Sequence, residues 1–181
     1  MKKKVFFTFG ILVVAIVIVL IYNIVSGSHR NVSGALNTIK LINIAKDCSI
    51  IAEGTGNTNA LTDGNSSTWW CTNNSNWPTS LIIALPTKGV ILDEIDLKFL
   101  QETQFPKRSL DINIDYDLVG GNTLSTGASD FKFFNNDFSF VFPPNSLVNK
   151  LKITLSNPKD AGNVGKFWPA IQEIEIYSPK S

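Results

Sequence analysis

Apolar and polar residues alternate along short stretches of this 181-residue chain, and this period of two is the strongest constraint on its fold. Residues 110–117, Leu-Asp-Ile-Asn-Ile-Asp-Tyr-Asp, alternate throughout, and residues 151–155 repeat the pattern. Successive side chains of a strand point to opposite faces, so each stretch predicts a strand with one buried face. Denser apolar runs at 90–100 and 138–142 predict strands deeper in a core.

Residues that favour turns separate these stretches. They are Pro86, Gly89, Gly120, Gly121, Asn135, Asn136, Pro143, Pro144 and Pro158. No long helical period appears after residue 25. Short strands with regularly spaced turn residues are typical of a β-sandwich, so the sequence predicts an all-β domain.

The segment Ala-Leu-Thr-Asp-Gly-Asn-Ser-Ser-Thr-Trp-Trp, at 60–70, combines a tight turn with oxygen donors and two large aromatic residues. Asp63 offers a carboxylate, and Gly64 permits the positive φ of a sharp turn. Asn65 and Thr68 add amide, hydroxyl and carbonyl oxygens, which suit Ca²⁺. The spacing predicts a loop folded round one ion. The alternative is an Asp-Gly turn between two strands that needs no metal.

Other segments accompany this one in a fixed order. They are residues 43–46, 48–52, 80–85, 105–108 and 170–177. Together with the Asp-Gly-Asn-x-x-Thr-x-Trp run they resemble the discoidin family, also called coagulation factor 5/8 type C domains, and the related family 32 carbohydrate-binding modules. The resemblance covers residues 43–177 and is sharpest in that run and in the ending Ile-x-Glu-Ile-Glu-Ile-Tyr at 171–177.

The resemblance implies a jelly-roll β-sandwich of galactose-binding-like type that binds ligands through loops at one end. It also implies a structural Ca²⁺ held by Asp63, Asn65, Thr68 and Glu173, with backbone carbonyls completing the site. Trp69 and Trp70 cannot both point inward if they lie on one strand. By the same likeness Trp70 is the core residue, and Trp69 is exposed or covered by a loop.

Composition agrees with a single binding domain. The chain is 44% hydrophobic, with 12 Phe and 4 Trp, which is enough for one packed core and too little for two large domains. Its formal net charge is +1, and without Lys2, Lys3 and Lys4 it has 13 basic and 15 acidic residues. This balance provides no electrostatic footprint for nucleic acid.

The N-terminus predicts the compartment. Lys2, Lys3 and Lys4 precede residues 5–25, an apolar run without charge that reaches about 30 Å as a helix, the thickness of a hydrocarbon core. We therefore expect an uncleaved transmembrane signal anchor at 1–25 with the lysines in the cytoplasm and the rest of the chain outside. The alternative is a cleaved signal peptide, which would make the protein secreted.

Residues 26–38, rich in Gly and Ser, predict a short flexible stalk that spans at most about 45 Å. The only histidine, His29, lies in this stalk. No Ser-His-Asp or Cys-His set is therefore available in the domain, and a zinc site would lack ligands. A pair of carboxylates of the glycosidase kind is a minority alternative, because Asp111, Asp115 and Asp117 alternate along a solvent face. We expect that the chain is not an enzyme.

Cys48 and Cys71 are the only cysteines. Outside the cytoplasm they could form a disulfide, which would stabilise the fold by about 3 kcal/mol on the chain-entropy model. Two buried thiols acting as small hydrophobic groups are an equal alternative.

A sugar site requires an exposed aromatic ring beside amide or cationic donors. Three segments offer this mixture, at 73–77, 104–108 and 163–168. The candidate ligand-binding residues are Asn74, Trp77, Phe105, Lys107, Arg108, Lys166, Phe167 and Trp168. The alternative is that Trp77 and Trp168 cap the core and the polar residues merely face water. These loops contain no histidine, which excludes galactose recognition through that residue.

The sequence thus predicts a membrane-anchored, extracytoplasmic sandwich at 39–181 that recognises carbohydrate. A phospholipid surface, contacted by Phe105 with Lys107 and Arg108, is one alternative ligand. Protein recognition, by an adhesion or accessory domain, is the other.

Overall fold

The computed structural model describes residues 40–53, 56–71, 77–101, 107–160, 163–164, 167 and 169–180. The chain divides into two compact units, Met1–Thr38 and Ile39–Ser181. The expected anchor at 1–25 and stalk at 26–38 lie outside the described residues, so both stay predictions. Within the described ranges, no helix has the length and apolar character needed to cross a bilayer.

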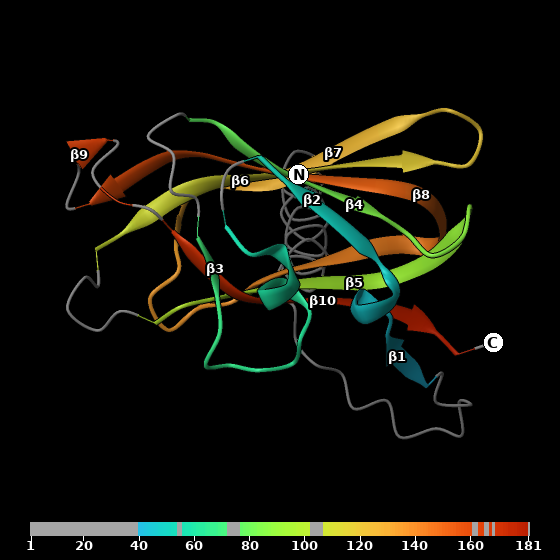
Figure 1. Cartoon of the computed structure of the whole chain (residues 1–181). Helices are drawn as coiled ribbons and strands as arrows, with labels where there is room; N and C mark the ends of the chain where they lie inside the picture. Colours follow the sequence, from blue (N-terminus) through green and yellow to red (C-terminus); the bar gives the residue numbers. More distant parts are fainter. Residues whose placement is uncertain are drawn as a thin grey trace, which may run out of the picture. The chain divides into compact units, whose positions relative to one another are not determined.

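The second unit is built from strands and two short 3-10 helices, as far as it is described (Figure 1). In chain order the elements are β1 (Leu41–Asn43), η1 (Ala45–Asp47), β2 (Ser49–Ala52), η2 (Thr58–Leu61), β3 (Trp70–Cys71), β4 (Thr79–Ala84), β5 (Val90–Phe99), β6 (Ser109–Leu118), β7 (Thr123–Lys132), β8 (Phe138–Asp160), β9 (Asn163–Val164) and β10 (Ala170–Pro179).

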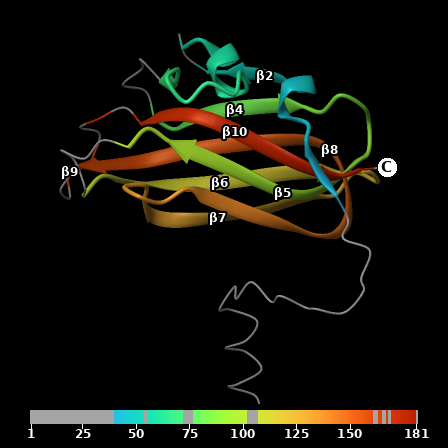
Figure 2. The same cartoon turned by 90° about the horizontal axis from the view of Figure 1, so that it is seen from below.

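These strands form two antiparallel layers that share β8, which lie one above the other in Figure 1 and are seen face-on in Figure 2. One layer has the order β1-β10-β5-β8, and β3 also pairs with β10. The other has the order β2-β4-β8-β6-β7. The predicted all-β sandwich is therefore confirmed.

β8 passes from one layer to the other. Residues 138–148 pair with β5, and residues 148–159 pair with β6. Residues 150–155 of β8 also pair with β4, along the edge of β8 opposite to β6. The expected break at Pro158 is wrong, because β8 continues through it. Pro143 and Pro144 do mark a turn, since the chain reverses direction there between its pairing with β5 and its pairing with β6. Proline cannot donate a ladder hydrogen bond, and both sites fall where the register shifts, opposite 92–94 and 109–111.

The core has the alternation that the sequence predicts. On β6, Leu110, Ile112, Ile114 and Tyr116 are at most 4% exposed. Leu151, Ile153 and Leu155 of β8 are fully buried, and they pair with Tyr116, Ile114 and Ile112 within the same layer. Aromatic rings extend this core between the layers, with Phe99 stacked on Phe133 at 5.1 Å and Tyr116 edge-on to Phe142 at 5.2 Å.

The connections gather at two opposite ends of the sandwich. At one end, called here the loop end, lie the end of β5, the start of β6, residues 133–137 between β7 and β8, and the start of β10. At the other, the turn end, lie the turns at 85–89 and 119–122 and the bend of β8 at 143–147. Figure 1 shows the turn end on the right, together with the C-terminal end of β10 and with β1.

Candidate functional site

The loop at 62–69, called here the Asp63 loop, is folded by hydrogen bonds between its own residues. The Asp63 carboxylate accepts from the Asn65 amide and from the Thr68 hydroxyl, at 2.8 Å each. The Asn65 carbonyl accepts from the amide and the hydroxyl of Thr68, at 3.0 and 2.8 Å. Gly64 has φ +71°, the positive value that the sequence predicted for the sharp turn. Asp and Asn thus supply the local acceptors that fold the loop.

Two residues of β10 hold this loop against the sandwich. The Gly64 amide donates to both carboxylate oxygens of Glu173, at 3.3 and 3.1 Å. The Gln172 side chain donates to the Ser66 carbonyl at 2.6 Å. The four predicted metal ligands, Asp63, Asn65, Thr68 and Glu173, are therefore linked in one region although more than 100 residues separate Gly64 from Glu173.

The charge at Glu173 is poorly compensated. Its side chain is buried, with 9% of the residue exposed, and burial raises the pKa of its carboxyl group. The negative charge of Asp63 raises this pKa further, whereas the Gly64 amide and the Lys46 ammonium lower it. The Lys46 ammonium nitrogen lies 3.2 Å from the position that a Cβ on Gly64 would take.

The donor chemistry of the loop fits a hard cation. Among the described residues, no group of three or more His, Cys, Asp and Glu side chains is arranged to hold a metal ion. The loop instead combines two carboxylates with hydroxyl, amide and carbonyl oxygens, and each carboxylate oxygen has more acceptor capacity than one hydrogen bond uses. Ca²⁺ accepts such mixed oxygen sets.

At the loop end, the Arg108 side chain is held by contacts with two other residues. Its guanidinium carbon lies 4.7 Å from the centre of the Phe167 ring, and its Nε donates to Asp160 at 3.3 Å. The Arg108 side chain is 12% exposed. Phe167 is 5% exposed and packs against Phe133 at 5.8 Å, so its ring lies in the core and supports Arg108.

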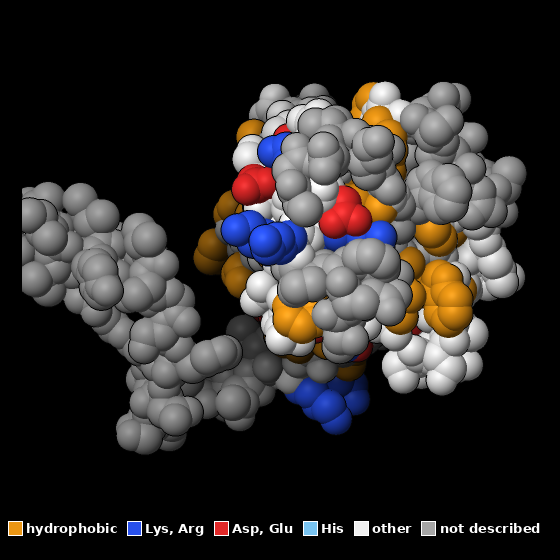
Figure 3. Space-filling view, turned by 90° about the vertical axis from the view of Figure 1, so that its left-hand side faces the viewer, with side chains coloured by type: hydrophobic (Ala, Val, Ile, Leu, Met, Phe, Trp, Pro, Cys, Tyr) orange, Lys and Arg blue, Asp and Glu red, His pale blue; other side chains and the backbone are white. Residues whose placement is uncertain are grey.

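The other candidate ligand residues have different positions. Lys107 is exposed, and Trp77 is half-buried against the core. Asn74, Phe105, Lys166 and Trp168 lie outside the described residues, so their roles stay predictions. Figure 3 looks onto this end and shows basic and acidic side chains next to each other.

A polar network that the sequence reading missed supports the loop end. Asp111 accepts from the Asn157 side chain at 2.6 Å and from the Asp130 amide at 2.8 Å, and these bonds lower the pKa of its carboxyl group. Asp130 in turn accepts from Ser109 at 2.7 Å and from Lys159 at 3.3 Å. Asp130 and Asn157 have positive φ, 53° and 48°, where Asp and Asn are more common than other side chains.

The tryptophan assignment is confirmed. Trp70 is fully buried and Trp69 is 50% exposed. Exposed Trp69 is an aromatic surface near the Asp63 loop that the sequence reading did not count among the ligand residues. The inability of two adjacent strand residues to point inward together was the signal for it.

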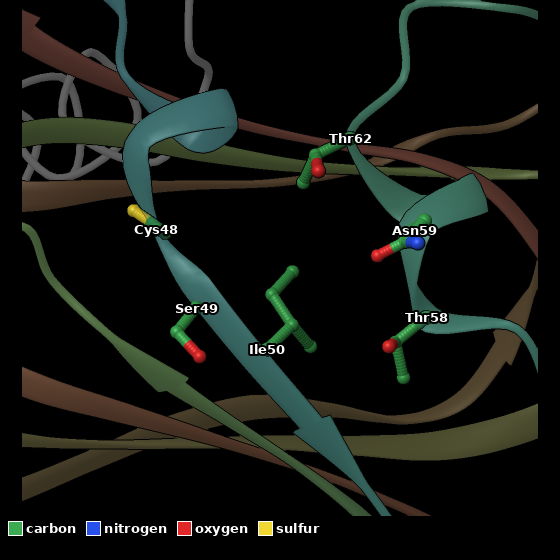
Figure 4. A pocket seen from close by; sticks show the side chains of 6 residues that line it. All are labelled: Cys48, Ser49, Ile50, Thr58, Asn59 and Thr62. Atoms are coloured by element: carbon green, nitrogen blue, oxygen red, sulfur yellow. The ribbon is translucent and has the colours of Figure 1, made fainter.

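No disulfide joins Cys48 and Cys71 in the structure. The Cys48 thiol donates to the Ile44 carbonyl at 3.4 Å, and burial raises its pKa to about 11. Cys48 borders a pocket of about 290 Å³ between β2 and η2 (Figure 4). The other lining residues are Ser49, Ile50, Thr58, Asn59 and Thr62.

No family model matches the sequence, and no curated protein matches it. Solved structures do match its fold. The Clostridium perfringens module CpGH89CBM32-4, in complex with glcNAc-alpha-1,4-galactose, has a TM-score of 0.56 and 19% identity over 81% of this chain and 99% of that chain. The family 32 module of C. perfringens NanJ, in complex with galactose, has a TM-score of 0.58 and 18% identity over 77% and 100%.

A chitosan-binding module of a chitosanase/glucanase from Paenibacillus sp. IK-5 also matches, with a TM-score of 0.59 and 12% identity over 76% of this chain and 99% of that chain. The matched modules are thus covered over almost their whole length. The fold of residues 39–181 is that of the family 32 carbohydrate-binding modules, the galactose-binding-like sandwich that the sequence resemblance implies.

Proposed function

We propose that residues 39–181 form a carbohydrate-binding module that recognises a glycan through its loop end. The observation that carries the proposal is the fold, which is shared over nearly the whole length of modules solved with sugars. The position of Arg108 supports it, because a guanidinium held by Phe167 and Asp160 loses little freedom when a ligand hydroxyl accepts from it. The proposal assigns the chain no catalytic step.

Ca²⁺ belongs to the same proposal as a structural ion. Asp63, Asn65, Thr68 and Glu173 would hold it, and its charge would neutralise the two carboxylates. The hydrogen bonds from Gly64 to Glu173 support this role, because they bring the two acidic residues together before any ion binds.

The anchor at 1–25 completes the proposal and places the module outside the cell, next to the membrane. The apolar run without charge and its three preceding lysines support this location. In a bacterial host the full chain should resist carbonate extraction and should expose its C-terminal unit to added protease. A soluble secreted form that begins near residue 28 would contradict the anchor.

A glycan array tests the binding proposal. The full chain, solubilised in detergent, should retain a defined set of glycans, and binding should weaken in chelator. Lys107→Ala and Arg108→Ala should each lower the affinity for the best glycan about tenfold, the equivalent of one lost polar contact. Lys150→Ala, an exposed lysine in the middle of β8, is the matched control.

Folded Lys107 and Arg108 variants with unchanged affinity would place the site elsewhere. Liposome flotation of the same chain without its anchor segment tests the lipid alternative. Flotation that needs Lys107 and Arg108, together with an array that retains no glycan, would replace the carbohydrate proposal.

A further inference from the structure

Exposed aliphatic side chains gather at the turn end of the sandwich. Val119, in the turn between β6 and β7, is 53% exposed, and Leu147, at the bend of β8, is 43% exposed. Ile91 pairs with Leu147 and is 38% exposed. Pro143 and Pro144 are exposed in the same bend. These residues come from three separate segments that the registers bring to one end.

A backbone hydrogen bond and close packing hold these aliphatic side chains in place. The Val119 amide donates to the Leu147 carbonyl at 2.9 Å, which ties the β6–β7 turn to the bend of β8. Gly89 lies beneath them, since a Cβ there would meet Val119 Cγ2 at 3.0 Å and Leu147 Cδ2 at 3.8 Å. The apolar tip is therefore a fixed feature of the folded domain and requires no rearrangement to contact a partner.

Three lysines lie at this end. Lys88 is exposed in the turn beside Gly89, and Lys40 and Lys180 are exposed where β1 meets β10. The Lys180 amide donates to the Lys40 carbonyl at 2.8 Å, so these two lysines are adjacent in the fold. On the strands that end here, Asp93, Glu94 and Asp117 are half-buried, and Asp47, two residues before β2, is exposed. Apolar tips with cations around them match a bilayer surface that carries anionic headgroups.

The chain enters the described domain at this same end. Asn43 of β1 pairs with Tyr177 of β10, which pairs with Glu94 of β5, so Lys40 lies at the level of the first residues of β5. Between the apolar run at 5–25 and Lys40 stand only about 14 residues. A flexible linker of that length has a root-mean-square span of about 20 Å.

We propose that the turn end, with Val119, Leu147 and Lys88 at its centre, rests on the anionic bilayer in which the N-terminal segment is anchored. The inference rests on the membrane anchor in the proposed function and is independent of glycan binding. Contact at the turn end directs the loop end away from the membrane, since the two lie at opposite ends of the strands. The bilayer surface then fixes the direction in which the module presents its ligand loops.

Amide hydrogen exchange of the full chain tests the contact. The chain is compared in detergent micelles, in nanodiscs of phosphatidylcholine, and in nanodiscs that contain about one third phosphatidylglycerol. Amides of residues 87–89 and 120 should exchange several-fold more slowly in the anionic nanodiscs than in the other two. Amides of 134–137, at the loop end, should exchange equally in all three.

Variants assign the protection to the side chains. Val119→Ser with Leu147→Ser should abolish the slower exchange, and Lys88→Glu should reduce it. Ile51→Ser is the matched control, because Ile51 is 66% exposed but lies on the edge strand β2. The control should keep the slower exchange.

Three results would overturn the proposal. If the chain incorporates fully into nanodiscs but its turn-end amides exchange equally in all three samples, the anchor is supported and the contact with the bilayer is disproved. Protection at 134–137 instead would make the loop end the lipid-binding surface. A chain that does not incorporate at all would remove the anchor as well, while the glycan array would still report on carbohydrate binding.

Discussion

The Asp63 loop and the Arg108 region, in which Arg108 contacts Asp160 and Phe167, both hold distant parts of the chain together, but they differ in how charge is balanced. In the Asp63 loop, carboxylates accept hydrogen bonds from backbone amides and a hydroxyl, and the burial of Glu173 near Asp63 leaves excess negative charge. At Arg108 the charge is balanced by Asp160, and the guanidinium packs on Phe167. The Arg108 region therefore has a balanced charge, whereas the Asp63 loop, with its two carboxylates, is the proposed cation site.

The largest expected effect tests whether the stability of the Arg108 region is independent of a cation. Phe167→Ala removes a core ring that contacts both Phe133 and Arg108, so it should cost about 3–5 kcal/mol of unfolding free energy. The cost should be equal in Ca²⁺ and in EDTA. Urea unfolding measures it, with Trp69→Ala as the exposed aromatic control at about 1 kcal/mol or less. A stable Phe167→Ala protein that fails to bind glycan would return Phe167 to the ligand site.

The next effect tests the need for a cation at the Asp63 loop. Ca²⁺ at a hundredfold excess over its Kd should raise the unfolding free energy by about 2.7 kcal/mol, and EDTA should remove the gain. Glu173→Gln should abolish this response. Glu175→Gln is the matched control on the same strand, since Glu175 pairs with Lys98 at 2.7 Å. If calorimetry shows no Ca²⁺ effect on the wild type, the loop is self-sufficient and the contrast between the regions fails.

A smaller effect distinguishes two reasons for glycine at position 64, the backbone conformation of the turn and the binding of an ion. Gly64→Ala places a Cβ at φ +71°, which should cost about 1 kcal/mol in Ca²⁺ and in EDTA alike. Gly64→Asn should cost less, because Asn tolerates the left-handed region. Thermal unfolding in both buffers compares them. A cost that appears only with Ca²⁺ would show that the ion, and not the backbone, requires glycine here.

The smallest effect concerns acid stability at the loop end. Hydrogen bonds from Asn157 and the Asp130 amide lower the folded pKa of Asp111. This group therefore stabilises the fold above its unfolded pKa, and the contribution is lost as the pH falls through the folded pKa. Urea midpoints between pH 6 and pH 2.5 should decline less steeply in Asp111→Asn than in the wild type. Asn157→Ala should remove part of the same decline, and identical slopes in all three proteins would exclude Asp111 as the source.

Sequence periodicity was sufficient for the strands and the core, because burial on one face of a sheet imposes a period of two. The alternation at 110–117 and 151–155 appears in β6 and β8 as predicted, and Trp70 and Trp69 divide as expected. The fold of the family 32 modules followed from short motifs at both ends of the domain. The continuity of β8 through Pro158 did not follow, because a turn residue in sequence does not reveal that a register shift can accommodate proline within a strand.

The site was less predictable than the fold. Local motifs located the Asp63 loop, and the family resemblance connected it to Glu173. The burial of Phe167 under Arg108 depends on how segments 59 residues apart meet, and the hydrogen bonds of Asp111 with Asn157 and Asp130 depend on the pairing of three strands. Neither arrangement leaves a periodic signal in the sequence.

The pairing of β1 with β10 has a mechanical consequence for the proposed tether through the N-terminus. Residue 40 leaves the domain along the axis of β1, and the hydrogen bonds to β10 are perpendicular to that axis. Tension between the proposed tether and a proposed ligand at the loop end would therefore run parallel to the strands and load these bonds in shear. They must yield together, whereas a pull across the strands would open them one at a time.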